Sequence, residues 1–465
     1  MLTFQDFEKD NDKKGFVLKA INEHILSPAC VWARRADCYD RQMNETVYNY
    51  VQMIYSASGD EVEDFTAANN KIASNFFNRL NTQRCTYSLG NGVDFTNNKE
   101  RIKQNGKWIT VDKTKKTLGK AFDTDFKKAG YLALIHGVSF CFWNIDKLYV
   151  FPLTEFVPLW DEYEGTLRAG IRFWRLAPDK PLIAVLYEED GYTRFQSKET
   201  GSSERLDIVE LKKKYKTIYE RTATDTEDVV IGEENYSKLP IVPFWGNRLH
   251  QSTLVGMQRA IDSFDLIRSG FANDLTDCAQ IYWIIENYGG MNDAELAQFR
   301  DRMKLTHIVN ADTSQGGAIK PYTQEIPFEA RKQYLEHIRS GIYEDFGGLD
   351  VHTISATATN DHIDAAYQPL DENADDFEFQ AIECIQQILE LIGIDDTPIF
   401  KRNRISNQLE QVQMVVQEAQ WLDTETILSK LPNISNDEIQ NILQATEIDD
   451  MNRMIGVEEM EINEE

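Results

Sequence analysis

The sequence predicts an α+β protein with more than one domain, and three observations lead to this expectation. The 465 residues are 42% hydrophobic, which is enough to fill more than one core. Apolar residues recur at helical spacing near the start of the chain and again through its second half. Between these regions, from 86 to 187, short apolar runs are separated by turn residues, as is typical of strands.

Two helices are expected in the N-terminal region. The first has apolar residues mostly three and four positions apart and should end at Ser27-Pro28. The second is predicted from 65 to 80. The apolar positions of the first helix are Phe16, Leu18, Ile21 and Ile25.

Five β-type runs follow, and the first of them precedes the Gly90-Asn91-Gly92 turn. The lysine run at 212–216 and the acidic, threonine-rich stretch up to 238 are interpreted as a solvated excursion. The next segment, 239–245, contains two prolines, which exclude a helix and a central strand. The five runs are Thr86–Leu89, Ser139–Asn144, Leu148–Phe151, Ala169–Trp174 and Leu182–Tyr187.

A long helix is predicted after residue 253, because apolar residues there keep a strict spacing of three and four over roughly 25 residues, or about 38 Å. A small α/β module should follow, with a strand at 280–285, a helix at 293–303, and strands at 306–310 and 318–322 that pair with each other. The apolar positions of the long helix are Leu254, Met257, Ile261, Phe264, Ile267, Phe271, Leu275 and Cys278.

A second long helix should open with Pro327 and close at Gly347-Gly348. Residues 349–360 are small, polar and β-branched, so we expect a loop there, followed by a third long helix that is broken or kinked at Pro369 and stops at Gly393. Further helices are expected at 409–422, at 423–430 and after a capping box at 435–438. The apolar face of the second helix consists of Phe328, Leu335, Ile338, Ile342 and Phe346.

The charge is strongly and unevenly acidic. The chain has 49 Lys and Arg against 76 Asp and Glu, a net charge of −27. Residues 361–465 hold 25 acids and 5 bases, and no Lys or Arg occurs from 340 to 400. A conventional DNA clamp is excluded, because such a protein needs surplus cations to neutralise phosphates.

The search for catalytic motifs finds no phosphate loop, nucleophile elbow or zinc-protease motif, so we expect no enzyme and no cofactor. Asp361, His362 and Asp364 have a spacing compatible with a nuclease-type divalent site, but we favour solvated acids at a helix N-terminus. The six cysteines show no metal-type pairing and are expected to be free thiols in a reducing compartment. The most apolar window, 129–145, is too short to cross a bilayer.

Four stretches in the same order and spacing make the chain resemble the portal proteins of long-tailed, double-stranded DNA bacteriophages. The most specific runs from Leu239 to Leu275, where Pro243-Phe244 precedes Ile261-Asp262-Ser263-Phe264-Asp265 and Asn273-Asp274. The other three are Asn70 to Gly90, Ala129 to Glu162, and the helix pair around the 347–360 loop with its acidic helical tail. Trp245-Gly246-Asn247 departs from the usual turn of the family.

The resemblance implies a ring of about twelve subunits at one capsid vertex. Its parts would be a wing (1–250), a first stem helix (251–279), a clip (280–326), a second stem helix (327–348), a tunnel loop (349–362), a long kinked helix (363–394) and an acidic crown and tail (395–465). The expected partners are double-stranded DNA, the terminase large subunit, the head–tail connector, and the major capsid and scaffolding proteins, with no membrane. The ring would assemble in the host cytoplasm and reside in the virion.

The resemblance also assigns three groups of residues. The DNA-facing tunnel loop would present Val351, His352, Thr353, Ser355, Thr357, Thr359 and Asn360. Stem packing would use Leu254, Met257, Ile261, Phe264, Ile267, Phe271, Leu335, Ile338 and Ile342. The clip would contact terminase or the connector through Glu295, Arg300, Arg302, Lys304 and Lys320. Two alternatives stay open, namely a metal-dependent phosphodiesterase or nuclease and a cytosolic scaffold.

Overall fold

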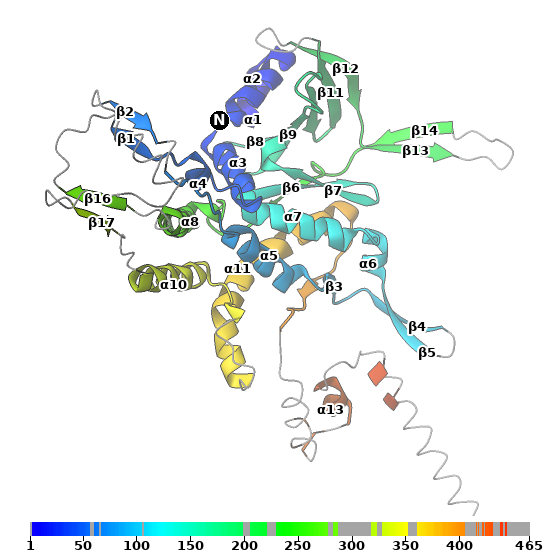
Figure 1. The fold of residues 1–465 in the computed structure, drawn as a ribbon. Coiled ribbons are helices and arrows are strands. Elements are labelled where there is room, and N and C mark those ends of the chain that lie inside the picture. The colour runs from blue at the N-terminus through cyan, green and yellow to red at the C-terminus, as the bar shows by residue number, and fades with distance from the viewer. Residues whose placement is uncertain are drawn as a thin grey trace, which may run out of the picture. The chain divides into compact units, whose positions relative to one another are not determined.

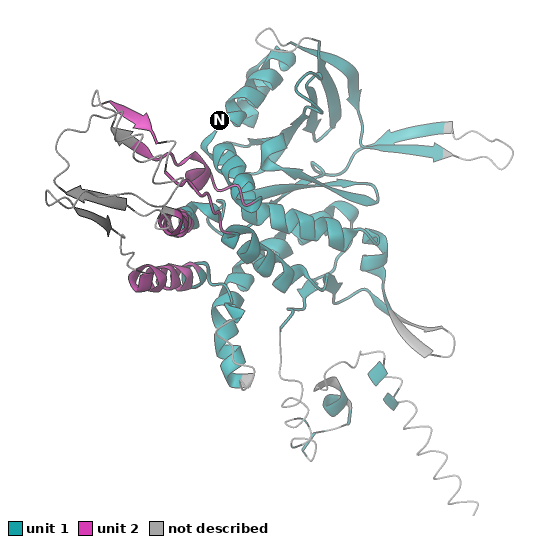
Figure 2. Ribbon diagram, viewed as in Figure 1, with its two compact units in different colours: residues 1–41, 75–258, 343–465 teal, residues 42–74, 259–342 magenta. Residues whose placement is uncertain are grey.

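The protein is a mixture of helices and antiparallel sheets (Figure 1). The computed structural model describes residues 2–55, 60–64, 67–104, 107–198, 205–220, 229–277, 282–286, 318–322, 328–351, 360–404 and 424–430, with a few single positions beyond 414. The chain divides into two compact units (Figure 2). Unit 1 holds residues 1–41, 75–258 and 343–465, and unit 2 holds 42–74 and 259–342.

In unit 1, a five-stranded antiparallel sheet has the strand order β12-β11-β10-β9-β8. Helix α2 (Lys13–Ile25) buries Phe16, Val17, Ala20 and Ile21 against it, which confirms the first predicted helix. Pro28 does not end the helical region, because Ser27 caps a new helix, α3 (Pro28–Asp40). The strands are β8 (Phe156–Trp160), β9 (Leu167–Trp174), β10 (Ile183–Glu188), β11 (Gly191–Ser197) and β12 (Leu206–Lys213).

A second sheet of unit 1 has the order β15-β6-β7, formed by β15 (Ile241–Trp245), β6 (Val138–Asn144) and β7 (Lys147–Pro152). Helices α7 (Phe122–His136) and α11 (Asn360–Ile392) pack on it through one column of stacked rings. The ring centroids of Phe126 and Phe244 lie 5.0 Å apart, and those of Phe244 and Phe377 lie 5.6 Å apart. Pro240 precedes β15 and Pro243 lies in it, and because β15 is an edge strand of this sheet, both positions agree with the expectation.

Four of the five predicted strands are confirmed, as β6, β7, β9 and β10. The strand predicted at Thr86–Leu89 is wrong, because these residues form the last turn of α5 (Phe76–Leu89), where Tyr87 and Leu89 are buried. The helix predicted at 65–80 is confirmed only from 76 to 80, because helical structure in the described residues begins at Phe76. The excursion at 211–238 is in part an antiparallel hairpin of β13 (Lys216–Glu220) and β14 (Val229–Glu234).

Smaller elements complete unit 1. The short helices are α1 (Phe4–Lys9), α6 (Lys113–Leu118) and the 3-10 turn at Leu153–Glu155. A hairpin joins β4 (Lys99–Gln104) to β5 (Lys107–Asp112), and β3 (Val93–Phe95) pairs with β18 (Pro398–Phe400). In the C-terminal region α13 (Thr424–Lys430) confirms the helix predicted at 423–430, whereas most of 409–422 and the capping box lie outside the described residues.

Unit 2 contains α4 (Glu45–Asn49), the hairpin of β1 (Met53–Tyr55) and β2 (Glu61–Glu63), and most of two long helices. The long helices are α8 (Leu254–Asp277) and α10 (Phe328–Phe346), both as predicted. Strand β16 (Tyr282–Glu286) pairs with β17 (Ala318–Tyr322). The partner predicted for β17, 306–310, and the helix at 293–303 lie outside the described residues.

The third long helix, α11, runs through Pro369 without a break and ends before Gly393 (φ 78°), so the predicted stop is confirmed and the break is not. In the described part of the chain, no helix is both long and apolar enough to span a membrane.

Candidate functional site

The turn that leaves α10 leads into the predicted loop. Gly347 (φ 62°) donates its N–H to Glu344 O at 3.0 Å, and Gly348 donates to Tyr343 O at 2.8 Å. These two bonds form a Schellman motif, so the glycine stop is confirmed. A Cβ on Gly348 would lie 2.5 Å from Leu80 Cδ2, so the absent side chain lets the turn approach α5 closely.

Two side chains of α5 hold the chain just after α10. Gln83 donates from Nε2 to Leu349 O and accepts from Leu349 N–H, both at 2.9 Å. Arg84 donates to Phe346 O at 3.1 Å, and its guanidinium lies 4.5 Å from the Phe346 ring centroid. Burial lowers the pKa of Arg84 to about 10. The main chain at the start of the loop is therefore fixed to α5 by hydrogen bonds from α5 side chains.

The other end of the loop, the first turns of α11, meets the same helix. Tyr367 stacks on Tyr87 with ring centroids 5.7 Å apart. Leu349 from the loop start and Ile363 from α11 belong to the same buried cluster. The two ends of the 352–359 segment therefore converge on Tyr87. The complete cluster is Tyr87, Leu349, Ile363, Tyr367, Leu370 and Ala374.

The assignment of the loop residues to a DNA path stays a prediction. Val351 is exposed, and Asn360 is the first residue of α11. The remaining predicted positions, namely His352, Thr353, Ser355, Thr357 and Thr359, lie outside the described residues.

The acidic side chains of α11 form ion pairs with two arginines that lie outside the cation-free run 340–400. Arg402 and Arg404, which follow that run directly, form ion pairs with four of its acids. The two positive charges offset half of the four negative ones within the subunit, so the absence of Lys and Arg from 340 to 400 does not leave all of its acids unpaired. The four acids are Asp364, Asp371, Asp375 and Glu378.

The predicted apolar face of α8 is buried only at its start, where Leu254, Met257 and Ile261 are almost inaccessible. Farther along, Phe264, Ile267 and Phe271 are half-buried. The fully or nearly buried residues of that part are polar, namely Asp265, Ser269 and Asn273. Within a single chain the apolar face predicted for the helix is therefore fully buried only at its start, and the stem role of the half-buried residues stays a prediction.

These three polar residues hold an extended segment, 70–74, along α8. Asp265 accepts the N–H of Ser74 at 2.9 Å, Ser269 accepts that of Ile72 at 3.0 Å, and Asn273 accepts that of Asn70 at 2.6 Å. Four residues of helix rise about 6 Å and two residues of extended chain about 6.6 Å, so the two spacings match. We call this arrangement the polar ladder.

In α10, of the predicted stem residues, Ile342 is buried, whereas Leu335 and Ile338 are half-buried. The ring of Phe328 lies 5.5 Å from that of Phe271, so α8 and α10 contact each other within unit 2. Of the predicted clip contacts, Lys320 lies on β17, and its side chain is outside the described part. Glu295, Arg300, Arg302 and Lys304 are outside it entirely.

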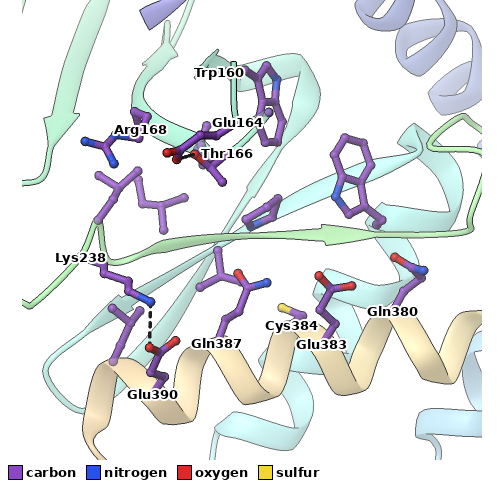
Figure 3. Close-up of a pocket in the computed structure, with 18 of the residues that line it drawn as sticks. Trp160, Glu164, Thr166, Arg168, Lys238, Gln380, Glu383, Cys384, Gln387 and Glu390 are labelled. Atoms are coloured by element: carbon purple, nitrogen blue, oxygen red, sulfur yellow. Dashed lines mark hydrogen bonds and ion pairs between the residues drawn. The ribbon is translucent and has the colours of Figure 1, made fainter. Parts of the chain in front are cut away.

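Unit 1 also has an open cleft of about 790 Å³ between α11, β15 and the β8–β9 turn (Figure 3). At one end Trp160 stacks on Trp245, with ring centroids 5.6 Å apart. At the other end Lys238 forms an ion pair with Glu390 at 2.7 Å. The cleft carries charges of both signs, and several of them are paired within the chain.

The metal-dependent alternative gains no support from the geometry. Among the residues that the structure describes, no group of three or more His, Cys, Asp and Glu side chains is arranged to hold a metal ion. Asp364 lies 3.2 Å from Arg404 Nη1 in an ion pair, which occupies one of the three side chains that the alternative requires.

Comparison with known proteins decides the family. The family model described as "Phage portal protein, SPP1 Gp6-like" matches residues 36–454. The chain belongs to this phage portal protein family. The portal protein of Clostridium phage phiCD119 is 26% identical over 390 residues, covering 78% of this chain and 82% of that protein. The portal protein of Bacillus phage SPP1 is 22% identical over 450 residues, covering 91% and 84%.

One solved structure, described as "Neck of native GTA particle computed with C12 symmetry", aligns with 70% of this portal family member and 80% of its own chain. The sequence identity is 12% and the TM-score is 0.32.

Sequence reasoning missed the residues that anchor the loop of this portal family member: Gln83, Arg84 and Tyr87 on α5, with Arg402 and Arg404. For Tyr87 the local pattern held no signal, because Thr86–Leu89 has the composition of a strand, and Gln83 and Arg84 lie between that run and the helix predicted at 65–80. For the arginines a signal existed, because residues 401–404 contain the first cations after 61 residues without any (340–400).

Proposed function

We propose that this chain forms a ring of about twelve copies at one vertex of a phage capsid. The ring would be the conduit for double-stranded DNA during packaging and ejection. The observation that carries the proposal is the match of residues 36–454 to the phage portal family, together with portal proteins of two phages over most of their length. A closed ring of identical copies uses heterologous contacts, in which one face of a subunit meets a different face of the next.

Within the ring we assign α8 and α10 to the stem and the segment between them to the clip. Helix α8 has 24 residues and α10 has 19, about 36 and 28 Å of helix. Their half-buried apolar residues, among them Ile267 and Leu335, support contacts with neighbouring copies, since a single chain leaves them partly open to water. The clip would dock the terminase large subunit and later the connector.

The 349–360 loop is assigned to the DNA path. A conduit must not hold the polymer that moves through it, because each cationic contact to phosphate releases counterions and adds affinity. The loop has hydroxyl and amide side chains and no fixed positive charge, so its hydrogen bonds to phosphates would be short-lived. Acids that keep their charge repel phosphates over about 8 Å at physiological salt.

The first experiment tests the ring. Purified full-length chain should give rings of about twelve times 53.6 kDa in mass photometry and negative-stain images. Only monomers and small aggregates over a wide range of salt would contradict the proposal.

The second experiment tests the loop. Thr357→Lys should slow or stall DNA packaging while ring formation stays normal, because twelve added cations would hold the phosphates. The matched control is Thr117→Lys on α6, where the residue is exposed. Packaging at the normal rate by rings of Thr357→Lys would separate this loop from the DNA path.

A further inference from the structure

We propose that residues 401–404 form a strap that positions the first half of α11, with Arg404 as its positioning residue. The proposal rests on the proposed function only where it assigns the 349–360 loop, which precedes α11, to the DNA path. The strap itself is argued from contacts within unit 1.

The first half of α11 needs such support because the two halves of the helix are held differently. The second half lies in the main core of unit 1, where Phe377, Ile385 and Ile388 are completely inaccessible. Among the described residues, the apolar contacts of the first half are those of the small cluster around Tyr87. Pro369 lies between the halves and has no N–H, so one helical hydrogen bond is missing there. Proline is a common point of helix bending.

Arg404 reaches both sides of this proline. Its Nη1 lies 3.2 Å from Asp364 Oδ1, which precedes Pro369, and its Nη2 pairs with Asp371 Oδ2, which follows it. Its Nε donates to the Tyr87 hydroxyl at 2.8 Å. One guanidinium thus connects both halves of α11 and α5. A planar fork of donors suits such a bridge, and a lysine would reach fewer partners.

Arg402 binds only the part of α11 that follows the proline. It lies 3.0 Å from Asp371 Oδ1 and 3.0 Å from Glu378 Oε2, and it also pairs with Asp375. Arg402 is therefore an anchor for the strap, whereas Arg404 alone connects across Pro369 among the described ion pairs. The difference gives two variants of similar charge and distinct expected effects.

The strap is itself fixed to the rest of unit 1. Asn403 donates its N–H to Tyr87 O at 3.1 Å, and Asn91 donates from Nδ2 to Lys401 O at 2.9 Å. Lys401 forms an ion pair with Asp94 at 2.8 Å, and β18, which pairs with β3, directly precedes it. The strap is thus a fixed element, and the first half of α11 is attached to it.

The test compares Arg404→Gln with Arg402→Gln by hydrogen exchange of full-length protein. Arg404→Gln should raise amide exchange at 363–368 roughly three- to tenfold, the size expected for partly exposed ion pairs, and leave 381–389 unchanged. Arg402→Gln should leave amide exchange at 363–368 near the wild-type rate. The control is Lys401→Gln, whose ion pair does not involve α11. Arg404→Lys should restore part of the protection.

Three outcomes would overturn the strap: unchanged exchange at 363–368 in Arg404→Gln, equal increases along all of α11, or the same increase in Lys401→Gln. High salt should raise exchange at 363–368 in the wild type and have little further effect in Arg404→Gln, because the ion pairs are partly exposed. A purely steric role of the side chain would show no such salt dependence.

A functional readout separates this inference from the proposed function. Rings of Arg404→Gln should assemble normally and package DNA more slowly than rings of Arg402→Gln. If the wild type forms no rings, the proposed function fails and the exchange result stands on its own. If rings form and package DNA, but amide exchange at 363–368 is the same in Arg404→Gln as in wild type, the strap proposal is wrong and the proposed function stands.

Discussion

Replacing Asp265 by alanine would test whether the polar ladder holds α8. Asp265 is completely inaccessible and accepts two hydrogen bonds, one from Ser74 N–H at 2.9 Å and one from Asn44 Nδ2. Burial raises the pKa of Asp265 above its ordinary value, while the bonds from Ser74 and Asn44 act in the opposite direction. The carboxylate is thus held in a buried place by the donors around it.

The expected loss in the free energy of unfolding follows from the hydrogen-bonding groups that each substitution leaves unpaired. Asp265→Ala leaves the Ser74 N–H without an acceptor, at about 1–3 kcal/mol, whereas Asn44 keeps its second bond to Ser74 O at 3.2 Å. The small cavity adds to the loss, and the removed desolvation of a carboxylate offsets part of it. We expect a net loss of about 2–3 kcal/mol. Asp265→Asn keeps an acceptor for Ser74 and should lose less than about 1 kcal/mol.

Hydrogen exchange at the amides of Asn70, Ile72 and Ser74 measures this loss where it occurs, which matters in a chain with two units. A loss of 2–3 kcal/mol corresponds to about 30- to 150-fold faster exchange at Ser74. Ser269→Ala is the matched control, since it should affect Ile72 more than Ser74. Equal effects of Asp265→Ala and Asp265→Asn would refute the hydrogen-bond reasoning, because the two variants share only the removed charge.

Three further predictions concern folding, assembly and pH. Gly348→Ala should destabilise the folded chain by about 1–3 kcal/mol in denaturant titrations, because its Cβ would meet Leu80, whereas Gly256→Ala, with no atom within 4 Å, should be neutral or stabilising. Ile261→Asp should prevent folding by burying an unpaired charge, while Phe264→Asp, at a half-buried position, should fold and impair ring formation in size-exclusion profiles. Burial acts to raise the pKa of Asp371, yet hydrogen bonds from Arg404 and Tyr87 hold that pKa below its ordinary value. Its stabilising effect is therefore present above about pH 4 and should be lost as pH falls through the lowered pKa. The protection at 363–368, taken relative to the intrinsic exchange rate at each pH, should then fall in wild type but not in Asp371→Asn.

The sequence predicted α8 as a helix but not which face of it would be buried. The apolar spacing from Leu254 to Phe271 is regular, and that regularity correctly indicates a helix. The buried face changes after Ile261 because the 70–74 segment supplies main-chain donors, and polar side chains are the groups that satisfy them. No local pattern reports on a partner almost 200 residues away in the chain.

The error at α5 has a different physical origin. Thr86–Leu89 has β-type composition and precedes two glycines, which is the usual signature of a strand before a turn. Tertiary contacts override this preference, because Tyr87 in the last turn of α5 stacks on Tyr367 and accepts a hydrogen bond from Arg404. The anchor of the candidate loop was therefore hidden in a segment whose local preference indicates another structure.

The ion pairs of the strap reduce the acidic charge that the 340–400 run can present to DNA. Counting residues from 340 to 400 shows acids without cations, and such a count assumes that each acid faces solvent. Arg402 and Arg404 pair with four of these acids inside the subunit, and their two positive charges offset half of the four negative ones, which weakens the field of this group. The repulsion of DNA then comes mainly from acids that the strap does not reach, together with the lack of cations in the 349–360 loop. A low affinity of the loop for phosphate therefore supports the conduit more directly than the net charge of the chain does.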